Sequence, residues 1–179
     1  MTRVVEVSPE RLEHWLERFE ANNPDGPQRV TAVETFDLDP LAVVLVRRGG
    51  YAVGLGRGDR LLRHKVGTRY VQSRTAAGGW SQQRFARRRA NQADGLVGAA
   101  AEHAVRLLGD LVPAGLVVGG DRALVATLLQ DDRLAGIRDL PRRELYDLPD
   151  PRLAVLEKAL ERGRAVRVTI DDGPPHPVG

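Results

Sequence analysis

The chain has 179 residues and contains no cysteine, with 42% hydrophobic and 28% charged residues. This size and balance predict one compact domain, with at most a small appendage, and exclude a disordered or fibrous chain. The lack of cysteine excludes disulfides, thiolate metal ligands and thiol catalysis, and it suits a reducing compartment. Residues 1–7 are too short and too charged for the core of a signal peptide, and no stretch is apolar for long enough to span a bilayer. We therefore expect a cytoplasmic protein without a membrane partner.

Basic residues are concentrated in one part of the chain. The formal net charge is +3, yet residues 41–93 hold twelve basic residues against one acid, Asp59, and the rest of the chain carries a net charge of −8. A split of this kind is expected of a surface that meets a polyanion. Nucleic acid is therefore the leading candidate partner.

The first elements predicted are a helix and a strand. Ser8 is a possible helix cap, and Pro9 suits the first helical position. Apolar residues then recur at helical spacing, namely Leu12, Trp15, Leu16 and Phe19. Residues 22–27 break the helix, and residues 29–36 are typical of a strand. We expect residues 1–39 to pack on, or extend, the main domain.

Residues 42–46 form a continuous apolar run, which is typical of a strand that is covered on both faces. Glycine-rich breaks at residues 48–50 and 56–59 follow it, and glycine there can adopt positive φ. An antiparallel meander is predicted, with arginines in its connections. Its strands are expected at residues 42–48, 50–56 and 60–71.

The longest helical pattern follows the glycines at residues 78–79. Its apolar positions step by three and four residues and are Ala86, Ala90, Ala93, Val97, Ala100, Ala104, Leu107 and Leu111. A narrow stripe rich in alanine predicts close packing on a sheet, with Ala86 facing the strands. Pro113 and Gly115 are expected to end this helix.

The last third of the chain predicts further strands and helices in alternation. Strands are expected at residues 116–118, near 137–140 and at 165–170. Asp121 is expected to cap a helix that runs to about Gln130. A second helix, opened by residues 150–151 and closed by Gly163, carries three leucines at helical spacing: Leu153, Leu156 and Leu160.

The fold class is therefore α/β, with a mixed sheet in which an antiparallel meander precedes βα units and helices cover the strands. We expect residues 40–170 to form the main domain and residues 171–179 to form a flexible tail.

A glycine-containing loop runs directly into the positive end of the long helix, a geometry that attracts phosphate. If Ala86 faces the sheet, a rotation of about 100° per residue puts Arg84, Arg88 and Asn91 on the opposite face, with Arg87 beside them. These side chains can bind the phosphates of a nucleic-acid backbone. Taken alone, such a loop is more often a plain turn, with Ser81 as a cap and the arginines as a solvated face.

The order Gly78-Gly79-Trp80-Ser81-Gln82, followed by an arginine-rich helix with an aromatic residue, favours the functional interpretation. It resembles the catalytic segment in the middle domain of eukaryotic and archaeal peptide release factors, where a Gly-Gly-Gln loop precedes such a helix. It is more similar to the Vms-like release factors, whose loop has a Gly-X-Ser-Gln pattern, and among these to an actinobacterial branch. The meander and the βα elements occur in the family's order, so the resemblance covers roughly residues 40–170. It implies the release-factor middle-domain fold, of RNase H-like or ribosomal-protein-like type.

The resemblance implies a peptidyl-tRNA hydrolase that cleaves the ester between nascent peptide and tRNA, in ribosome rescue and quality control. The implied catalytic residues are Gly78, Gly79, Ser81, Gln82 and Gln83. Trp80 and Ser81 separate the glycines from two adjacent glutamines, so the register must be chosen; we choose Gln82, with Gln83 as the alternative. A glutamine amide both donates and accepts and stays neutral, which suits the positioning of water.

The RNA-binding residues expected beside this loop are Arg74, Arg84, Arg87, Arg88, Arg89 and Asn91. The expected partners are peptidyl-tRNA and the ribosome or its large subunit, and no DNA. We expect no cofactor and no metal, because the histidines are scattered without a carboxylate pattern beside them. They are His14, His64, His103 and His176.

Two other functions remain open. One is an endonuclease of the same family that cuts tRNA near its 3′ end, and the other is a non-catalytic RNA- or ribosome-binding module. The acidic pairs Asp131-Asp132 and Asp171-Asp172 are interpreted as a helix end and part of the tail. Residues 117–121 resemble a phosphate turn but lack the lysine and further glycines of nucleotide-binding loops, so a structural turn is expected.

Overall fold

The computed structural model describes residues 1–68 and 81–173, and only the backbone of residues 81 and 82. The fold is mixed α/β with two sheets, where the sequence predicted one. The chain divides into a small unit, Met1–Asp37 with Glu161–Gly179, and a main unit, Leu38–Leu160. Each unit has its own sheet.

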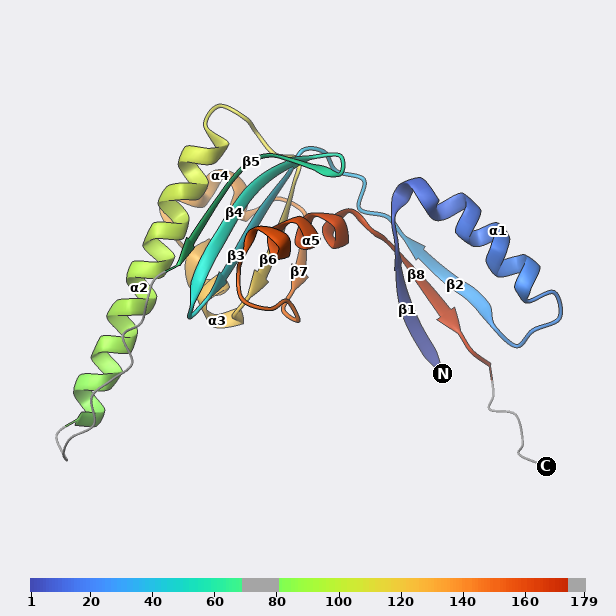
Figure 1. Cartoon of the computed structure of the whole chain (residues 1–179), viewed down its shortest axis with the longest axis horizontal. Coiled ribbons are helices and arrows are strands. Elements are labelled where there is room, and N and C mark those ends of the chain that lie inside the picture. Colours follow the sequence, from blue (N-terminus) through green and yellow to red (C-terminus); the bar gives the residue numbers. More distant parts are fainter. Residues whose placement is uncertain (69–80, 174–179) are drawn as a thin grey trace. The chain divides into compact units, whose positions relative to one another are not determined.

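Within the described residues, the main unit holds a five-stranded sheet of order β5-β4-β3-β6-β7 (Figure 1). The predicted antiparallel meander is present, and two further strands run parallel to β3 and to each other. The strands are β3 (Leu41–Arg47), β4 (Gly50–Arg57), β5 (Arg60–Thr68), β6 (Gly115–Gly120) and β7 (Arg142–Leu145). Every residue from Leu41 to Val46 is buried, as the continuous apolar run predicted for a strand covered on both faces.

Helices cover both faces of this sheet. On one face, α2 (Ser81–Leu108) and α3 (Arg122–Leu129) pack against side chains of the central strands, such as Val44 and Leu116. On the other face, α5 (Leu153–Arg164) places Leu156 beside Gly54 of β4. The absence of a side chain at Gly54 lets this helix approach the strand closely.

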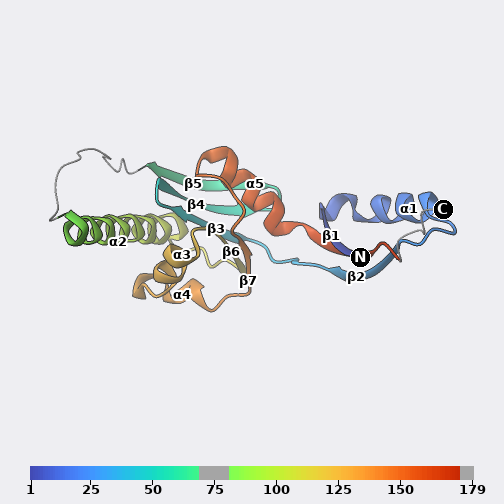
Figure 2. The same cartoon turned by 90° about the horizontal axis from the view of Figure 1, so that it is seen from below.

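Helix α2 is longer than the sheet it covers. Its 28 residues span about 42 Å at 1.5 Å per residue, whereas a strand of six to nine residues spans about 20–30 Å. Its first turns therefore project past the strands (Figures 1 and 2). Ala86 and Ala90 are exposed, and continuous packing on the core begins near Leu96, so the prediction that Ala86 faces the sheet is wrong.

The predicted end of α2 was also too late. The helix ends at Leu108, because Gly109 adopts a φ of +52° and donates its N–H to the carbonyl oxygen of Val105 over 3.0 Å. Leu111 lies beyond the end of the helix and still packs against the core.

The predicted cap of α3 is confirmed. The Asp121 carboxylate accepts hydrogen bonds from the backbone N–H groups of Ala123, at 2.9 Å, and Leu124, at 3.1 Å. These bonds satisfy donors that the first turn leaves without a partner in the helix.

The strand predicted near residues 137–140 is wrong. A 3₁₀ turn, Asp132–Leu134, continues into α4 (Ala135–Arg138), and the strand β7 begins only at Arg142. Leu134 and Ile137 are both buried, and their spacing of three is helical. The short apolar run was therefore one face of a helix.

The small unit packs one helix on an antiparallel sheet. Within the described residues, this sheet has three strands in the order β1-β8-β2, which are β1 (Thr2–Val7), β8 (Val166–Asp171) and β2 (Arg29–Glu34). A 3₁₀ turn, Pro9–Arg11, leads into α1 (Leu12–Asn22). Trp15 and Phe19 of α1 stack at 5.4 Å between ring centroids and pack against the core of this sheet.

The carboxyl-terminal strand changes the expected division of the chain. Residues 161–170 were assigned to the main domain, but β8 lies between β1 and β2 and belongs to the small unit. The tail was expected to be loose from Asp171, yet Asp171 ends β8, and Asp172 donates its N–H to the carbonyl oxygen of Met1 over 2.8 Å. The remainder of the tail, residues 174–179, lies outside the described residues.

Candidate nucleic-acid interface

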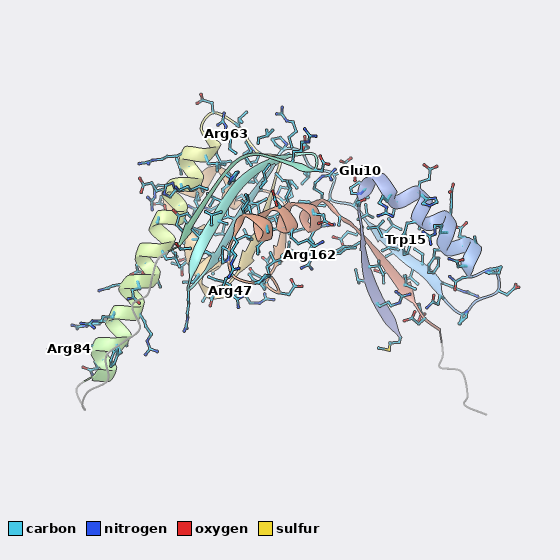
Figure 3. All side chains as sticks on the ribbon, viewed as in Figure 1. Glu10, Trp15, Arg47, Arg63, Arg84 and Arg162 are labelled. Carbon is cyan, nitrogen blue, oxygen red and sulfur yellow. The ribbon has the colours of Figure 1, made fainter. Side chains whose placement is uncertain are left out.

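The projecting start of α2 is an exposed basic surface. All residues from Gln83 to Asn91 are exposed, including the predicted contacts Arg84, Arg87 and Arg88. Figure 3 shows Arg84 near the end of the helix that projects past the sheet. No aspartate or glutamate occurs anywhere in residues 60–93, so the positive charge of this surface is not balanced by acids of the same segment.

The arginines of this surface differ from arginines elsewhere in the protein. Among the described residues, no carboxylate pairs with Arg84, Arg87 or Arg88. By contrast, Arg106 at the far end of the same helix pairs with Glu102, and Arg133 pairs with Asp131 over 2.7 Å. A cation without a protein partner can bind an anion without first breaking an ion pair, which favours a role in binding.

The remaining predicted contacts continue this surface. Arg89 is exposed and donates from Nε to the carbonyl oxygen of Phe85 over 3.4 Å, one turn earlier in the helix. Asn91 is exposed at the end of the basic run and contributes a neutral amide. The structure therefore brings the predicted residues from 84 to 91 together on one projecting helix end.

An exposed aromatic side chain lies within the same surface. Phe85 is 43% exposed, although a phenylalanine is normally buried. Aromatic rings beside arginines form a typical surface for single-stranded nucleic acid, because the bases stack on the ring while the cations hold the phosphates. The resemblance included Phe85 as the aromatic residue of this helix but gave it no role, and its exposure depends on the projection of α2 beyond the sheet.

A groove of about 1440 Å³ runs beside this surface. It is lined by residues of the first half of α2, by the turn between β3 and β4, and by the start of α3. Arg48 of that turn faces the groove together with Arg88 and Arg89 of α2. The sequence indicated arginines in the connections of the meander but did not assign Arg48 to the site, because only the folded sheet brings that turn to α2.

The predicted catalytic loop is only partly described. Arg74, Gly78 and Gly79 lie outside the described residues. The backbone of Ser81 and Gln82 forms the start of α2, and their side chains are also outside the description. Gln83 is exposed in the first turn of the helix. The roles given to these residues therefore stay predictions.

The acidic pairs have structural partners. Asp131 accepts hydrogen bonds from Arg133, and these bonds, with further backbone and charge contributions, hold the pKa of its carboxyl at about 2. Asp172 accepts from Arg3 over 3.1 Å and from Gln28 over 2.8 Å.

Within the described part of the chain, no group of three or more His, Asp or Glu side chains is arranged to hold a metal ion. That part also contains no helix long and apolar enough to cross a membrane.

The main unit is a mixed α/β fold with a projecting helix end, whose Arg84, Arg87 and Arg88 have no carboxylate partner among the described residues; a basic surface of this kind is expected of a protein that meets a polyanion. The sequence of the chain matches the family described as "Actinobacteria/chloroflexi VLRF1 release factor" over residues 39–169. The chain therefore belongs to this family of release factors. The match confirms the resemblance inferred from residues 78–82 and their surroundings.

Among solved structures, the chain is similar to the crystal structure of the archaeal translation termination factor aRF1. The two share 19% sequence identity with a TM-score of 0.44, and the alignment covers 66% of this chain and 32% of that one. The chain thus spans about a third of the length of that relative. No curated protein matches the sequence.

Proposed function

We propose that this release-factor family member is a peptidyl-tRNA hydrolase, which cleaves the ester between a nascent peptide and tRNA during the rescue of stalled ribosomes. The main unit then corresponds to the hydrolase domain in the middle of longer release factors. The observation that carries this proposal is the family match over residues 39–169, because it includes both the Gly78–Gln82 segment and the basic start of α2. The residues proposed for catalysis and those proposed for RNA binding are then adjacent in the sequence.

The chemistry requires little from ionisable side chains. A peptidyl ester is already activated, so a loop that positions water and offers amide donors to the developing oxyanion can supply much of the catalysis. We assign the water-positioning role to Gln82, whose neutral amide both donates and accepts hydrogen bonds. Gly78 and Gly79 would let the backbone approach the acceptor end of the tRNA closely. The terminal ribose hydroxyl of the tRNA would assist the reaction.

The basic surface supplies the binding. Arg84 and Arg88 are one helical turn apart, about 6 Å along the axis, and both are exposed without a carboxylate partner among the described residues. Arginine suits phosphate because its planar group donates two parallel hydrogen bonds. Contacts to the sugar–phosphate backbone position an RNA without reading its sequence, which fits a factor that must act on many different tRNAs.

The test is a single-turnover reaction of the full chain with peptidyl-tRNA, free and bound to ribosomes. Both products are examined, namely the peptide and the 3′ end of the RNA. Release of peptide together with an intact CCA end is the expected result. A shortened RNA still joined to its peptide would instead identify a nuclease, and binding without any turnover would identify a binding module.

Two variants make the reaction informative. Gln82→Ala should lose release while it keeps RNA binding, and Arg60→Ala serves as a control because this exposed arginine is the first residue of β5, directly after the β4–β5 turn. That turn is at the opposite end of the meander from the β3–β4 turn, which borders the groove. Equal loss of release in both variants would mean that the assay reports general damage rather than the site.

A further inference from the structure

We propose that the groove beside α2 binds a short stretch of single-stranded RNA, with Arg48 as the contact opposite Arg88 and Arg89. The identification of this RNA as the 3′ end of tRNA rests on the proposed function. The lining, the charge and the size of the groove favour single-stranded RNA independently of that function.

Three elements that are distant in sequence build the groove. Arg48 and Gly49 come from the turn that joins β3 to β4, Arg88 comes from α2, and Asp121 precedes α3. All of them belong to the main unit, whose sheet fixes the turn relative to the helices. A ligand in this groove would therefore contact Arg48 on one side and the helix on the other.

The two adjacent arginines where β3 ends and the turn begins, Arg47 and Arg48, have different roles. Arg47 donates from Nη1 to the carbonyl oxygen of Leu148 over 3.0 Å and lies 3.8 Å from the carboxylate of Asp150. It therefore stabilises the loop that contains these two residues. Arg48 has no hydrogen-bond or ion-pair partner among the described residues and lines the groove. Its charge is therefore available to a ligand.

The charge of the groove selects an anionic ligand. Its basic side chains are Arg48, Arg88 and Arg89, and Asp121 is the one carboxylate among the described residues that line it. The Asp121 carboxylate is already used, because it accepts hydrogen bonds from two N–H groups of α3. Those N–H groups are consequently occupied, and an incoming phosphate is left to the arginines.

The floor of the groove, which consists of alanines of α2, and the size of the groove favour a polymer with apolar faces. Ala86, Ala90 and Ala93 form the part of the alanine stripe that is not buried against the core, and they leave room that larger side chains would fill. The groove volume of about 1440 Å³ exceeds the roughly 300–1,000 Å³ of a typical small-molecule pocket. A single RNA strand offers both the phosphates for the arginines and the bare ribose and base faces for the floor.

The experiment measures binding of a fluorescent single-stranded RNA that ends in CCA and carries no peptide, by anisotropy at several salt concentrations. Arg48→Ala should weaken binding about tenfold, as expected for one charge-assisted contact, and should reduce the slope of log affinity against log salt by about 0.7. Arg60→Ala, at the start of β5 and at the other end of the meander, should bind like the wild type.

A second pair of variants tests the space rather than the charge. Ala90→Leu should block the floor and weaken binding at least tenfold, whereas Ala126→Leu should have no effect, because Ala126 is exposed on α3 away from the groove lining. Both changes introduce the same good helix former, so thermal unfolding should be similar in the two variants.

Wild-type affinity in both Arg48→Ala and Ala90→Leu would overturn the proposal. Equally strong competition by double-stranded RNA of the same charge, or by a hexaglutamate peptide, would also overturn it, because neither has exposed bases. Failure of the proposed function gives a different result: the RNA binds through Arg48 as described, yet peptidyl-tRNA is never hydrolysed.

Discussion

The backbone N–H of Asp121 donates a hydrogen bond to the carbonyl oxygen of Val46 over 2.8 Å. This bond joins the start of α3 to the end of β3, beside the groove that Asp121 and Arg48 line. Gly120, the residue before Asp121, has a φ of +106°, and a Cβ at this position would collide with the same carbonyl group. The edge of the groove therefore depends on a glycine.

Gly120→Ala should destabilise the protein by about 2 kcal/mol or more, because it combines an unfavourable backbone conformation with a steric clash. Urea unfolding measures the change. Gly136→Ala is the matched control, since Gly136 lies in α4 and a Cβ there meets no atom within 4 Å. That variant should be as stable as the wild type or slightly more so. Equal stability of the two variants would contradict the strained conformation at Gly120.

The Asp131 carboxylate should make the stability of the fold depend on pH in the acidic range. Hydrogen bonds from Arg133 lower its pKa from 3.8 to about 2 in the folded state. The contribution of the charged carboxylate is therefore fully present above about pH 4 and disappears as the pH falls through about 2. Asp131→Asn should be less stable than the wild type in urea at pH 6, and the two proteins should converge near pH 2.

Asp132→Asn is the control for this comparison. The Asp132 side chain is fully exposed, and the nearest Arg138 nitrogen is 3.7 Å away, so the substitution should change stability little. A constant difference between the wild type and Asp131→Asn from pH 6 to pH 2 would show that the asparagine acts through something other than the charge.

The elements with a strong local pattern could be predicted from the sequence. The buried β3, the long α2 and the Asp121 cap depend on neighbouring residues, and all three are present. The position of β8 could not be predicted in this way, because Thr2 of β1 pairs with Asp171 across nearly the whole chain. Pairing between such distant strands is decided by the folded structure and leaves no spacing signal in the sequence.

The same distinction applies to the site. The run from Arg84 to Arg89 could be identified because its arginines lie close together in the sequence and no acid lies between them. Arg48 could not be assigned, since its place in the same groove as Arg88 depends on the pairing of β3 with β4 and on how far α2 projects. The sequence stripe that begins at Ala86 also gave no sign of where the sheet beneath α2 ends.

RNA binding should depend on Arg84 and Arg88 through charge. Replacement of both by alanine should lower the affinity for tRNA and reduce the slope of log affinity against log salt by about 0.7 to 0.9 for each phosphate that is no longer neutralised. Arg106→Ala is the control on the same helix, because Arg106 pairs with Glu102 and lies at the other end of α2. A salt response that does not change in the double variant would remove these arginines from the interface.

Peptide release should continue in the presence of a chelator, because the proposed mechanism uses amide groups and water rather than a metal ion. Release is measured with EDTA, while binding of deacylated tRNA is followed in parallel to detect any effect of magnesium on the RNA. Abolished release with unchanged tRNA binding would indicate a metal enzyme and would contradict the mechanism.

The last prediction concerns the choice between two adjacent glutamines. The Gly-X-Ser-Gln pattern of the similar release factors selects Gln82, and Gln83 is one step further along the first turn of α2. Gln82→Ala should slow peptide release by about 10² to 10³, the loss expected when a group that acts in the transition state is removed. Folding and RNA binding should change little, because a glutamine at the start of a helix contributes little to stability.

The comparison that decides between them is Gln82→Ala against Gln83→Ala in single-turnover release at saturating protein. Gln83 is exposed, and its replacement by alanine favours the helix slightly, so Gln83→Ala should release peptide at a rate close to that of the wild type. A large defect in Gln83→Ala with near-normal release by Gln82→Ala would move the catalytic role by one residue. Near-normal release by both would place the catalytic centre outside this segment, and the RNA-binding surface of α2 would then serve another active site.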